Sequence, residues 1–505
     1  MASFWSCVRT GAEGLRYNKG NNFQPAGVST MIEEYHAKIN RHDPYEDYEL
    51  LRSFSEVLKR SAERHPEDAA LIFEQYYERQ AITYGDFYEA ILSKAQEIRQ
   101  LNIECVGIIG SSTPSWLLNV FAWTIAGRRV VMLDESLTNE ETKRRMEETG
   151  VEFVYSDNRQ KLSALKPVAE QIRAVRRLTR PGTPIEVECG GEMLFYSSGT
   201  TEAGHAVVLS QEALCASALN GGQLMECFPG DAVVCTLPYT HVYGFVAGIL
   251  WPMTFGASVI VGNTARFTRQ ERDRLEATIM VTTSPGLRYV MSSGAFNPHL
   301  RAILVGAGPI DRDILKKAQK QCEVRFGYGL TETASGIAMN VENGDLTAMQ
   351  LCPGTSARID YDGELIVSTP SMMDGYYHRP EETALRLQDG ELSTRDLAHF
   401  DENGLLHIDG RKNELLTLKS GEKIFCLPIE QELGQLMGSQ VVLSVRENDE
   451  LVLTVLGPES MRSEVEEKLR EFNDSRTDGL HIDRVVLRTE PFPRTITGKI
   501  KRYLL

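Results

Sequence analysis

Three features are absent from the sequence: a long apolar run, a secretory leader and paired cysteines. The longest apolar runs extend from Trp116 to Gly127 and from Phe245 to Val261. The first is too short to cross a bilayer and the second is interrupted by Pro252, so both are expected to be buried elements rather than membrane spans. The N-terminal residues carry charges among their apolar side chains and do not read as a signal peptide.

Cysteine usage points to a reducing compartment. The nine cysteines are an odd number, are dispersed along the chain and include no Cys-x-x-Cys pair. This pattern favours free thiols over a disulfide framework or a zinc site. The expected location is cytoplasmic.

An excess of positive charge is also missing. The chain has 54 Lys and Arg against 70 Asp and Glu, a net charge of -16, which argues against nonspecific binding to nucleic acid or to an anionic membrane. With 42% hydrophobic and 25% charged residues, the composition is that of a soluble globular protein. A site for a polyanion would therefore need positive charge concentrated locally.

Short β-rich runs alternate with helical stretches over most of the chain. The expected strands are Val106–Ile109, Val130–Leu133, Phe153–Tyr155, Met193–Tyr196, Ala232–Cys235, Ser258–Val261, Ile279–Val281 and Ile303–Val305, and the clearest helices between them are Tyr84–Leu101 and Asn139–Thr149. Alternation of this kind predicts parallel sheets covered by helices.

The pattern changes after about Gly354. Ala357–Thr369 and Gly404–Ile424 are typical of hairpins around Asp362-Gly363 and Asn403-Gly404, and the tail then alternates strand, strand, helix and strand. We therefore predict an α/β fold with a large N-terminal domain of helix-covered sheets, residues 1–410, and a small C-terminal α+β cap, residues 411–505.

A hydroxyl-rich loop follows the predicted strand that ends at Tyr196. It contains Ser197, Ser198, Gly199, Thr200 and Thr201. Glycine lets a backbone approach an anion closely, and short hydroxyls with successive N–H groups can surround phosphate oxygens. A polar turn between two strands would have the same composition, so the loop alone leaves both readings open.

Further motifs follow in a fixed order. They are Leu237-Pro238-Tyr239-Thr240-His241-Val242-Tyr243-Gly244-Phe245, Gly306-Ala307-Gly308-Pro309, Phe326-Gly327-Tyr328-Gly329-Leu330-Thr331-Glu332, Gly363-Glu364-Leu365, Thr394-Arg395-Asp396-Leu397, Gly410-Arg411-Lys412-Asn413-Glu414 and Pro493-Arg494-Thr495-Ile496-Thr497-Gly498-Lys499-Ile500. Together with the loop, this ordered set resembles the adenylate-forming superfamily of acyl- and aryl-CoA synthetases, peptide-synthetase adenylation domains and luciferases.

The resemblance implies a nucleotide site. The hydroxyl loop would hold the β- and γ-phosphates of ATP, Thr331 would bond the α-phosphate, and Glu332 would be the Mg²⁺ ligand, which suits a metal that takes few carboxylates alongside substrate phosphates. Asp396 would accept the ribose hydroxyls and Arg411 would add a permanent charge. The nucleotide residues implied in this way are Ser197, Ser198, Gly199, Thr200, Thr201, Gly306, Ala307, Gly308, Tyr328, Gly329, Asp396 and Arg411, with the Tyr328 ring stacked on adenine.

It also implies a mobile cap and a nearby acid pocket. Lys499 would reach the reacting carboxylate, and the cap would then turn about Lys412-Asn413 so that the loop from Lys419 to Ile424, with Gly421, serves thioester formation. The acid pocket would involve His241, Tyr243, Phe245 and Gly329. The stretch from Thr240 to Val246 holds no acidic residue that could pair an α-ammonium, which argues against an α-amino acid and indicates an apolar slot.

Four positions depart from the family pattern. After the two threonines the family continues Gly-x-Pro-Lys-Gly, whereas this chain has Glu202 first and His205 where the lysine would stand. Lysine is permanently charged near neutral pH, whereas histidine has an ordinary pKa of ~6.5. Arg395 occupies a position where the family usually has glycine, so the local backbone shape is expected to differ, and Asn413 replaces the usual Asp or Lys of the hinge.

Three functions compete at this stage. The favoured one is an ATP-dependent acid:thiol ligase that joins a fatty or aryl acid to coenzyme A through an acyl-AMP. The second loads the phosphopantetheine of an acyl or peptidyl carrier protein, which would act in trans because no carrier domain is found before the chain ends at Leu505. The third is a nucleotide-binding homologue with weakened catalysis, suggested by Glu202, His205 and Arg395.

Overall fold

The computed structural model describes most of the chain, from the end of the N-terminal segment to the start of the C-terminal motif. The described residues are 34–36, 50–110, 113–179, 191–197, 204–262, 274–293, 297, 299–308, 311–340, 345–412, 415–417, 423–445, 450–476, 480–493 and 500.

The largest sheet has nine strands and a parallel centre. Its order is β15-β14-β13-β12-β11-β9-β10-β2-β3, and the strands from β13 to β2 are parallel while the outer ones are antiparallel. In chain order the strands are β2 (Ala69–Gln75), β3 (Glu78–Thr83), β9 (Ala232–Cys235), β10 (Ser258–Val261), β11 (Ile279–Thr282), β12 (Ala302–Val305), β13 (Glu323–Tyr328), β14 (Ala338–Met339) and β15 (Gln350–Leu351).

A second sheet of six strands repeats this design on a smaller scale. Its order is β18-β8-β7-β5-β4-β6, with β6, β4, β5 and β7 parallel and with β8 and β18 added antiparallel. The strands are β4 (Cys105–Ile109), β5 (Arg129–Leu133), β6 (Phe153–Ser156), β7 (Met193–Tyr196), β8 (Ala206–Leu209) and β18 (Gly375–Tyr376).

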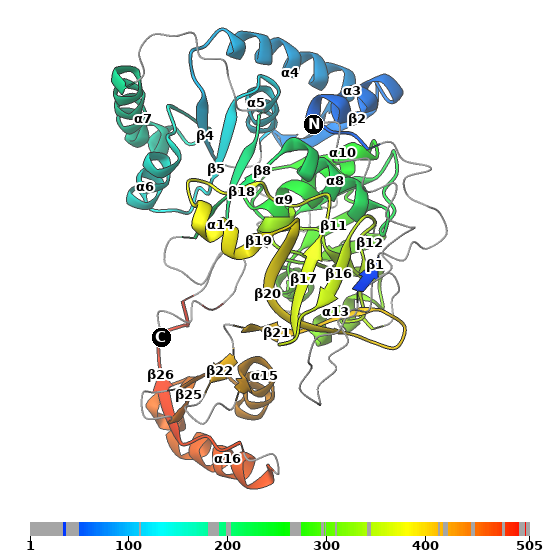
Figure 1. The fold of residues 1–505 in the computed structure, drawn as a ribbon. Helices are drawn as coiled ribbons and strands as arrows, with labels where there is room; N and C mark the ends of the chain where they lie inside the picture. The colour runs from blue at the N-terminus through cyan, green and yellow to red at the C-terminus, as the bar shows by residue number, and fades with distance from the viewer. Residues whose placement is uncertain are drawn as a thin grey trace, which may run out of the picture.

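The third sheet is antiparallel throughout. It joins β1 (Glu34–His36), β16 (Ser356–Ile359), β17 (Glu364–Ser368), β20 (Glu391–Phe400) and β19 (Leu387–Gln388) in that order, and β21 (Leu406–Arg411) pairs with β20. Figure 1 shows β16 and β17 of this sheet in yellow-green and β20 in gold, with blue β1 at one edge and the short helix α14 (Pro380–Arg386) against β19 and β20.

Helices cover the two parallel sheets, and most of those with a described N-terminus begin with a capping hydroxyl. They are α3 (Phe54–Arg64), α4 (Tyr84–Arg99), α5 (Pro114–Ile125), α6 (Asn139–Thr149), α7 (Arg159–Thr179), α8 (Gln211–Gly222), α9 (Val242–Phe245), the π-helix η1 (Val246–Leu250), α10 (Trp251–Thr254), α12 (Ser284–Ser292), α13 (Arg312–Ala318) and the 3₁₀ turn η3 (Thr331–Thr333). Ser53, Thr83, Thr113, Thr138, Ser210 and Thr283 each accept a hydrogen bond from a first-turn N–H.

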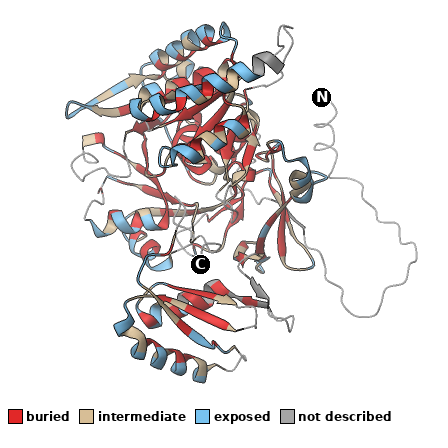
Figure 2. Cartoon of the chain, turned by 90° about the vertical axis from the view of Figure 1, so that its left-hand side faces the viewer, coloured by how far each residue is buried: buried red, intermediate tan, exposed pale blue. Residues whose placement is uncertain are grey.

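The C-terminal elements have a hydrophobic core of their own. They comprise β22 (Leu415–Thr417), β23 (Lys423–Phe425), α15 (Cys426–Met437), β24 (Val441–Val445), β25 (Leu451–Leu456), the 3₁₀ turn η5 (Glu459–Met461), α16 (Arg462–Ser475) and β26 (Arg484–Arg488). Their buried side chains, from Ile424 to Val485, form a cluster separate from the cores of the larger sheets. Figure 1 shows these elements grouped apart from the body, and Figure 2 shows buried residues concentrated on the strands of each group.

The fold class predicted from the sequence is confirmed. Each of the eight strands expected in the N-terminal part appears within a residue of its expected ends, and Asn139–Thr149 is a helix with those bounds. The two long apolar runs are buried as α5 and as the segment from α9 to β10. Among the described residues no helix is long and apolar enough to span a bilayer, and the seven described cysteines are free.

Candidate functional site

Residues from all three large sheets line one cavity of about 380 Å³. Ser197 and His205 lie at the facing ends of β7 and β8, Gly327 and Gly329 lie at the end of β13, and Thr394 and Arg395 lie on β20. The full lining is Ser197, His205, His241, Val242, Tyr243, Ala307, Gly327, Gly329, Leu330, Thr331, Glu332, Ser335, Tyr376, Glu382, Leu385, Arg386, Thr394, Arg395 and Arg411.

One end of the cavity is built around a buried carboxylate. Asp396 is 1% exposed, its Oδ2 accepts a hydrogen bond from the Tyr328 hydroxyl at 2.6 Å, and its Oδ1 lies 2.8 Å from Nε of Arg411. Burial, followed by the charge of Asp396, raises the pKa of Tyr328 well above its ordinary value, so the phenol stays a donor. We call Tyr328, Asp396 and Arg411 the ribose side, after the role expected for Asp396.

Close backbone packing shapes the β13 end. A side chain at Gly329 would place its Cβ 2.0 Å from the carbonyl oxygen of Ser335, and one at Gly306 would place it 2.9 Å from the Tyr243 ring. Neither gap admits a Cβ atom. Ala307, which also lines the cavity, has a left-handed backbone with φ of 58°.

Glu332 lies deeper in the same cavity. It is 8% exposed, and its Oε1 accepts a hydrogen bond of 2.7 Å from the Tyr376 hydroxyl. Among the described residues no contact engages its other oxygen. Within the part of the chain that the structure describes, no group of three or more His, Cys, Asp or Glu is placed to hold a metal ion. Magnesium can take a single carboxylate and complete its coordination with substrate phosphates and water.

His205 is held by an acidic partner. Its Nδ1 lies 3.0 Å from Oε2 of Glu382 on α14, and its ring centre lies 5.1 Å from that of Tyr376. Its backbone N–H donates to Oγ of Ser197, and its carbonyl accepts from the Ser197 N–H. These two hydrogen bonds join the residue after β7 to the residue before β8.

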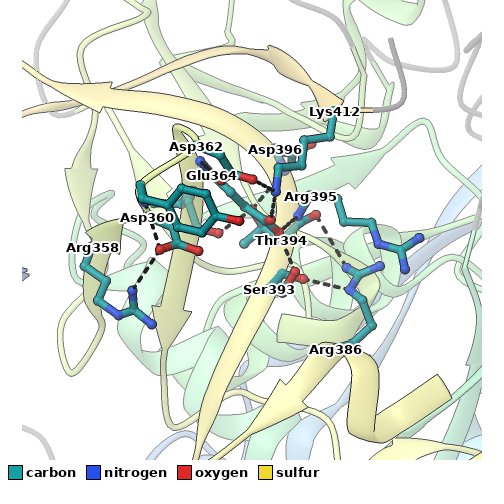
Figure 3. Close-up of polar contacts among 12 residues, drawn as sticks. Arg358, Asp360, Asp362, Glu364, Arg386, Ser393, Thr394, Arg395, Asp396 and Lys412 are labelled. Carbon is teal, nitrogen blue, oxygen red and sulfur yellow. Dashed lines mark hydrogen bonds and ion pairs between the residues drawn. The ribbon is translucent and has the colours of Figure 1, made fainter. Parts of the chain in front are cut away.

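Arg395 adopts the backbone conformation of the glycine it replaces. Its φ is 60°, in the left-handed region, and its N–H donates to Oε1 of Glu364 at 2.7 Å. Glu364 also accepts hydrogen bonds from Ser393 and Lys412, as Figure 3 shows. Burial raises the pKa of Glu364, but these hydrogen bonds outweigh it and leave the pKa below its ordinary value.

The remaining residues predicted for the acid pocket separate into two groups. His241 and Tyr243 line the cavity, and Nδ1 of His241 accepts the Tyr243 N–H at 3.2 Å, so this histidine also caps α9. Phe245 does not line the cavity. It is fully buried, and its ring centre lies 5.6–6.3 Å from the ring centres of Phe54, Phe121 and Phe195. The structure gives it a place in the core.

A second, smaller cavity of about 50 Å³ shares Tyr243, Gly327 and Ser335 with the first. Its lining is Ser217, Ala218, Gly221, Gly222, Met225, Tyr243, Val246, Ala247, Trp251, Leu304, Gly327, Ser335, Gly336, Ala338, Met339 and Cys352. None of these residues carries a charge at neutral pH. The apolar slot expected near Tyr243 and Val246 therefore opens beside the polar cavity.

Several predicted residues fall outside the described residues. They are Ser198, Gly199, Thr200, Thr201, Asn413, Gly421 and Lys499. Gly306 and Gly308 are described but do not line the cavity, and neither does the Tyr328 ring.

The sequence did not point to Tyr376, Glu382, Arg386 or Glu364 as site residues. The first three line the cavity, and Glu364 supports the backbone of Arg395. Glu364 lies within one of the motifs, Gly363-Glu364-Leu365, which was the only available signal.

The chain is similar to enzymes that activate carboxylic acids. It is 26% identical over 472 residues to a 2-succinylbenzoate–CoA ligase of Listeria monocytogenes, covering 88% of this chain and 97% of that protein. It is 25% identical to an indoleacetate–CoA ligase of Aromatoleum aromaticum, covering 79% and 87%. The structure of O-succinylbenzoate coenzyme A synthetase from Bacillus subtilis in complex with AMP has a TM-score of 0.73 at 22% identity, covering 89% and 97%, a likeness of fold.

The family model for AMP-binding enzymes matches residues 58–377, which is more than half of the chain. This segment contains the hydroxyl loop, the motif around His241 and the motif that ends at Glu332. The protein belongs to the AMP-binding enzyme family.

Proposed function

We propose that the protein is an ATP-dependent carboxylic acid:thiol ligase with coenzyme A as its thiol. A carboxylate oxygen attacks the α-phosphorus of ATP, the bond to the β-phosphate breaks, and acyl-AMP and pyrophosphate form. The sulfur of the thiol then attacks the acyl carbon, the thiol gives up its proton, and AMP leaves with the bonding electrons. The observation that carries this proposal is the cavity lined by Thr331, Glu332 and Arg411, beside which lies a smaller apolar cavity that shares part of its lining.

The residues of the cavity suit the first half-reaction. In our proposal, Asp396 and Arg411 hold the ribose, with the Tyr328 hydroxyl fixing the carboxylate, and Thr331 donates to the α-phosphate. Glu332 would hold Mg²⁺, which neutralises phosphate charge when bound. His241 would orient the acid, and Lys499 would stabilise the charge that develops between carboxylate and phosphate. Positioning and electrostatics supply most of the rate in reactions of this kind.

The proposed substrate is a compact apolar acid, aryl rather than long-chain fatty. The slot of about 50 Å³ has room for only a few water-sized groups and offers no charged partner. An α-amino acid would bury an unpaired ammonium there, which is costly. The names of the relatives, a succinylbenzoate and an indoleacetate ligase, support an aryl acid.

We also propose a cytoplasmic setting. Its support is the seven free cysteines among the described residues, because thiols stay reduced in that compartment.

The test is a panel of carboxylic acids scored by pyrophosphate release, with and without CoA. We expect single-ring and short apolar acids to release pyrophosphate, free α-amino acids not to, and acyl-CoA to accumulate only when CoA is added. If the acyl group were transferred to a phosphopantetheinyl carrier protein but not to CoA, the carrier protein would be the acceptor in place of CoA. Absence of pyrophosphate release with every acid, despite ATP binding, would favour a homologue with weakened catalysis.

A further inference from the structure

We propose that the guanidinium of Arg395, supported by Arg386, binds the β- and γ-phosphates of ATP in place of the lysine that the phosphate loop lacks. This inference rests on the proposed function and adds to it a cationic contact contributed by β20 and α14. Figure 3 shows Arg386 with its hydrogen bonds to the backbone of β20, next to Arg395 in the chain.

The need for such a contact comes from the loop itself. The position that resembles the loop lysine is His205, and its imidazole faces Glu382 at 3.0 Å. Glu382 lies in turn 3.2 Å from Arg379. His205 is therefore directed to a carboxylate in this structure, and Glu202 adds negative charge to the sequence of the loop. A polyphosphate needs a cation from elsewhere.

Arg395 and Arg386 are placed to supply it. Both line the cavity with Glu332, the expected magnesium ligand. Tyr376 lines it too, and its hydroxyl donates to Oε1 of Glu332 at 2.7 Å. The arginines therefore face the part of the cavity where phosphates would meet the metal.

The two side chains are held differently. Arg386 is anchored, because its Nε donates to the carbonyl of Ser393 at 2.7 Å and its Nη2 to that of Thr394 at 3.4 Å. The side chain of Arg395 is exposed and, within the described chain, makes no hydrogen bond or ion pair. Figure 3 shows it extending away from the contacts of Glu364 and Lys412. Five N–H donors are thus available for an anion.

The backbone of Arg395 supports a functional reading. A left-handed φ of 60° is unfavourable for a residue with a side chain, and the Glu364 carboxylate holds this conformation through the Arg395 N–H. Glycine would meet the backbone requirement without strain. The charge that the arginine brings to the cavity therefore explains why a residue with a side chain occupies this position.

The experiment compares three ligands: one with both the ribose and the β- and γ-phosphates, one with the ribose but neither of these phosphates, and one with phosphates alone. Binding of MgATP, inorganic pyrophosphate and AMP would be measured by calorimetry on the wild-type protein and on Arg395→Gln, Arg395→Lys and Arg395→Gly. Arg64→Gln is the control, because it removes one exposed charge at the last turn of α3, away from the cavity lining. We expect Arg395→Gln and Arg395→Gly to weaken MgATP and pyrophosphate by about tenfold, the size of one charge-assisted hydrogen bond, and to leave AMP unchanged.

Each other outcome is informative. Arg395→Lys should recover part of the loss, and Arg64→Gln should show none. Equal weakening of AMP and MgATP would overturn the inference, because it would mean that the substitution disturbs the adjacent Asp396. Unchanged pyrophosphate affinity would also overturn it. If the wild-type protein bound neither MgATP nor AMP, the proposed function itself would fail, which is a different result from loss confined to the variants.

Discussion

The two ends of the nucleotide cavity differ in how closely they follow the family pattern. On the ribose side, Tyr328, Asp396 and Arg411 match the motifs, and Asp396 lies 2.6 Å from the Tyr328 hydroxyl and 2.8 Å from Nε of Arg411. The phosphate side, which we define as His205, Tyr376, Glu382, Arg386 and Arg395, contains two of the departures, His205 and Arg395. Both ends line or adjoin the same space, so one end can keep the family's contacts while the other replaces them.

Two of the departures, His205 and Arg395, line the same cavity although they are far apart in sequence. His205 contacts Glu382, and the rings of His205 and Tyr376 are 5.1 Å apart. Arg395 and Arg386 line the cavity with that same tyrosine. The histidine at the loop-lysine position, just before β8, is therefore accompanied by arginines on β20 and α14. This arrangement favours a rebuilt phosphate site over a site that is losing its function.

The largest effect is expected from a residue outside both ends, Lys499. If it stabilises charge in the adenylation step, Lys499→Ala should lower acyl-AMP formation by ~10²- to 10³-fold, as removal of one preorganised donor does. Conversion of supplied acyl-AMP to thioester should stay within roughly a few-fold of the wild type, because the cap would then have turned. Single-turnover assays of each half-reaction measure the two rates.

Two results would contradict that prediction. A parallel fall in both half-reactions would assign Lys499 a structural or product-binding role, and no fall in either would mean adenylation without this lysine. The control is a conservative change at the same position, Lys499→Arg, which keeps the charge.

The next largest effect should fall on the ribose side. Asp396→Asn removes a charge that is bonded to both Tyr328 and Arg411, and we expect it to weaken AMP and MgATP together by about 10- to 100-fold. Tyr328→Phe is the matched milder change and should weaken both by less. Calorimetry on both nucleotides checks the result. If Asp396→Asn affected MgATP alone, the division into two sides would be wrong.

A smaller effect is expected from restoring the loop cation on the phosphate side. His205→Lys alone should gain little MgATP affinity, because the new ammonium would pair with Glu382. Combined with Glu382→Gln, it should tighten MgATP by about tenfold, most clearly above pH 7, where an ordinary histidine has lost its charge. ATP titrations over a pH series compare the two variants with Glu382→Gln alone. A full gain from His205→Lys by itself would show that Glu382 does not compete.

The fold could be predicted from the sequence because each part repeats a local signal. The buried strands of the parallel sheets are continuous apolar runs such as Ser258–Val261, and helices begin at hydroxyl caps such as Thr138. The pairing of strands is harder to predict from the sequence. Nothing local indicates that β1 joins β16 across the chain or that β18 extends the second sheet, because both pairings depend on distant segments.

The site was predictable only where a motif carried it. Glu332 and His241 line the cavity with other motif residues, and Asp396 lies beside it, paired with Arg411. Glu382 and Arg386 belong to an exposed-looking helix whose sequence gives no sign of a cavity, and only the packing of α14 beside β18 brings them there. For Arg395, the changed backbone shape stays a prediction, and the contact of its N–H with Glu364 could not be predicted from the sequence.

The smallest predicted effect separates backbone from charge at Arg395. A residue with a Cβ in the left-handed region costs roughly 1–2 kcal/mol relative to its usual conformation, and glycine avoids this cost but loses more entropy on folding. We therefore expect Arg395→Gly to be about 1 kcal/mol more stable to denaturant than Arg395→Ala, while both lose the same phosphate affinity. Asp389, with φ of 51° on the exposed turn between β19 and β20, is the matched control. Asp389→Gly and Asp389→Ala should show the same difference in unfolding free energy with no change in pyrophosphate binding. If Arg395→Ala were as stable as Arg395→Gly, the left-handed backbone would carry no strain, and charge alone would have to account for an arginine at this position.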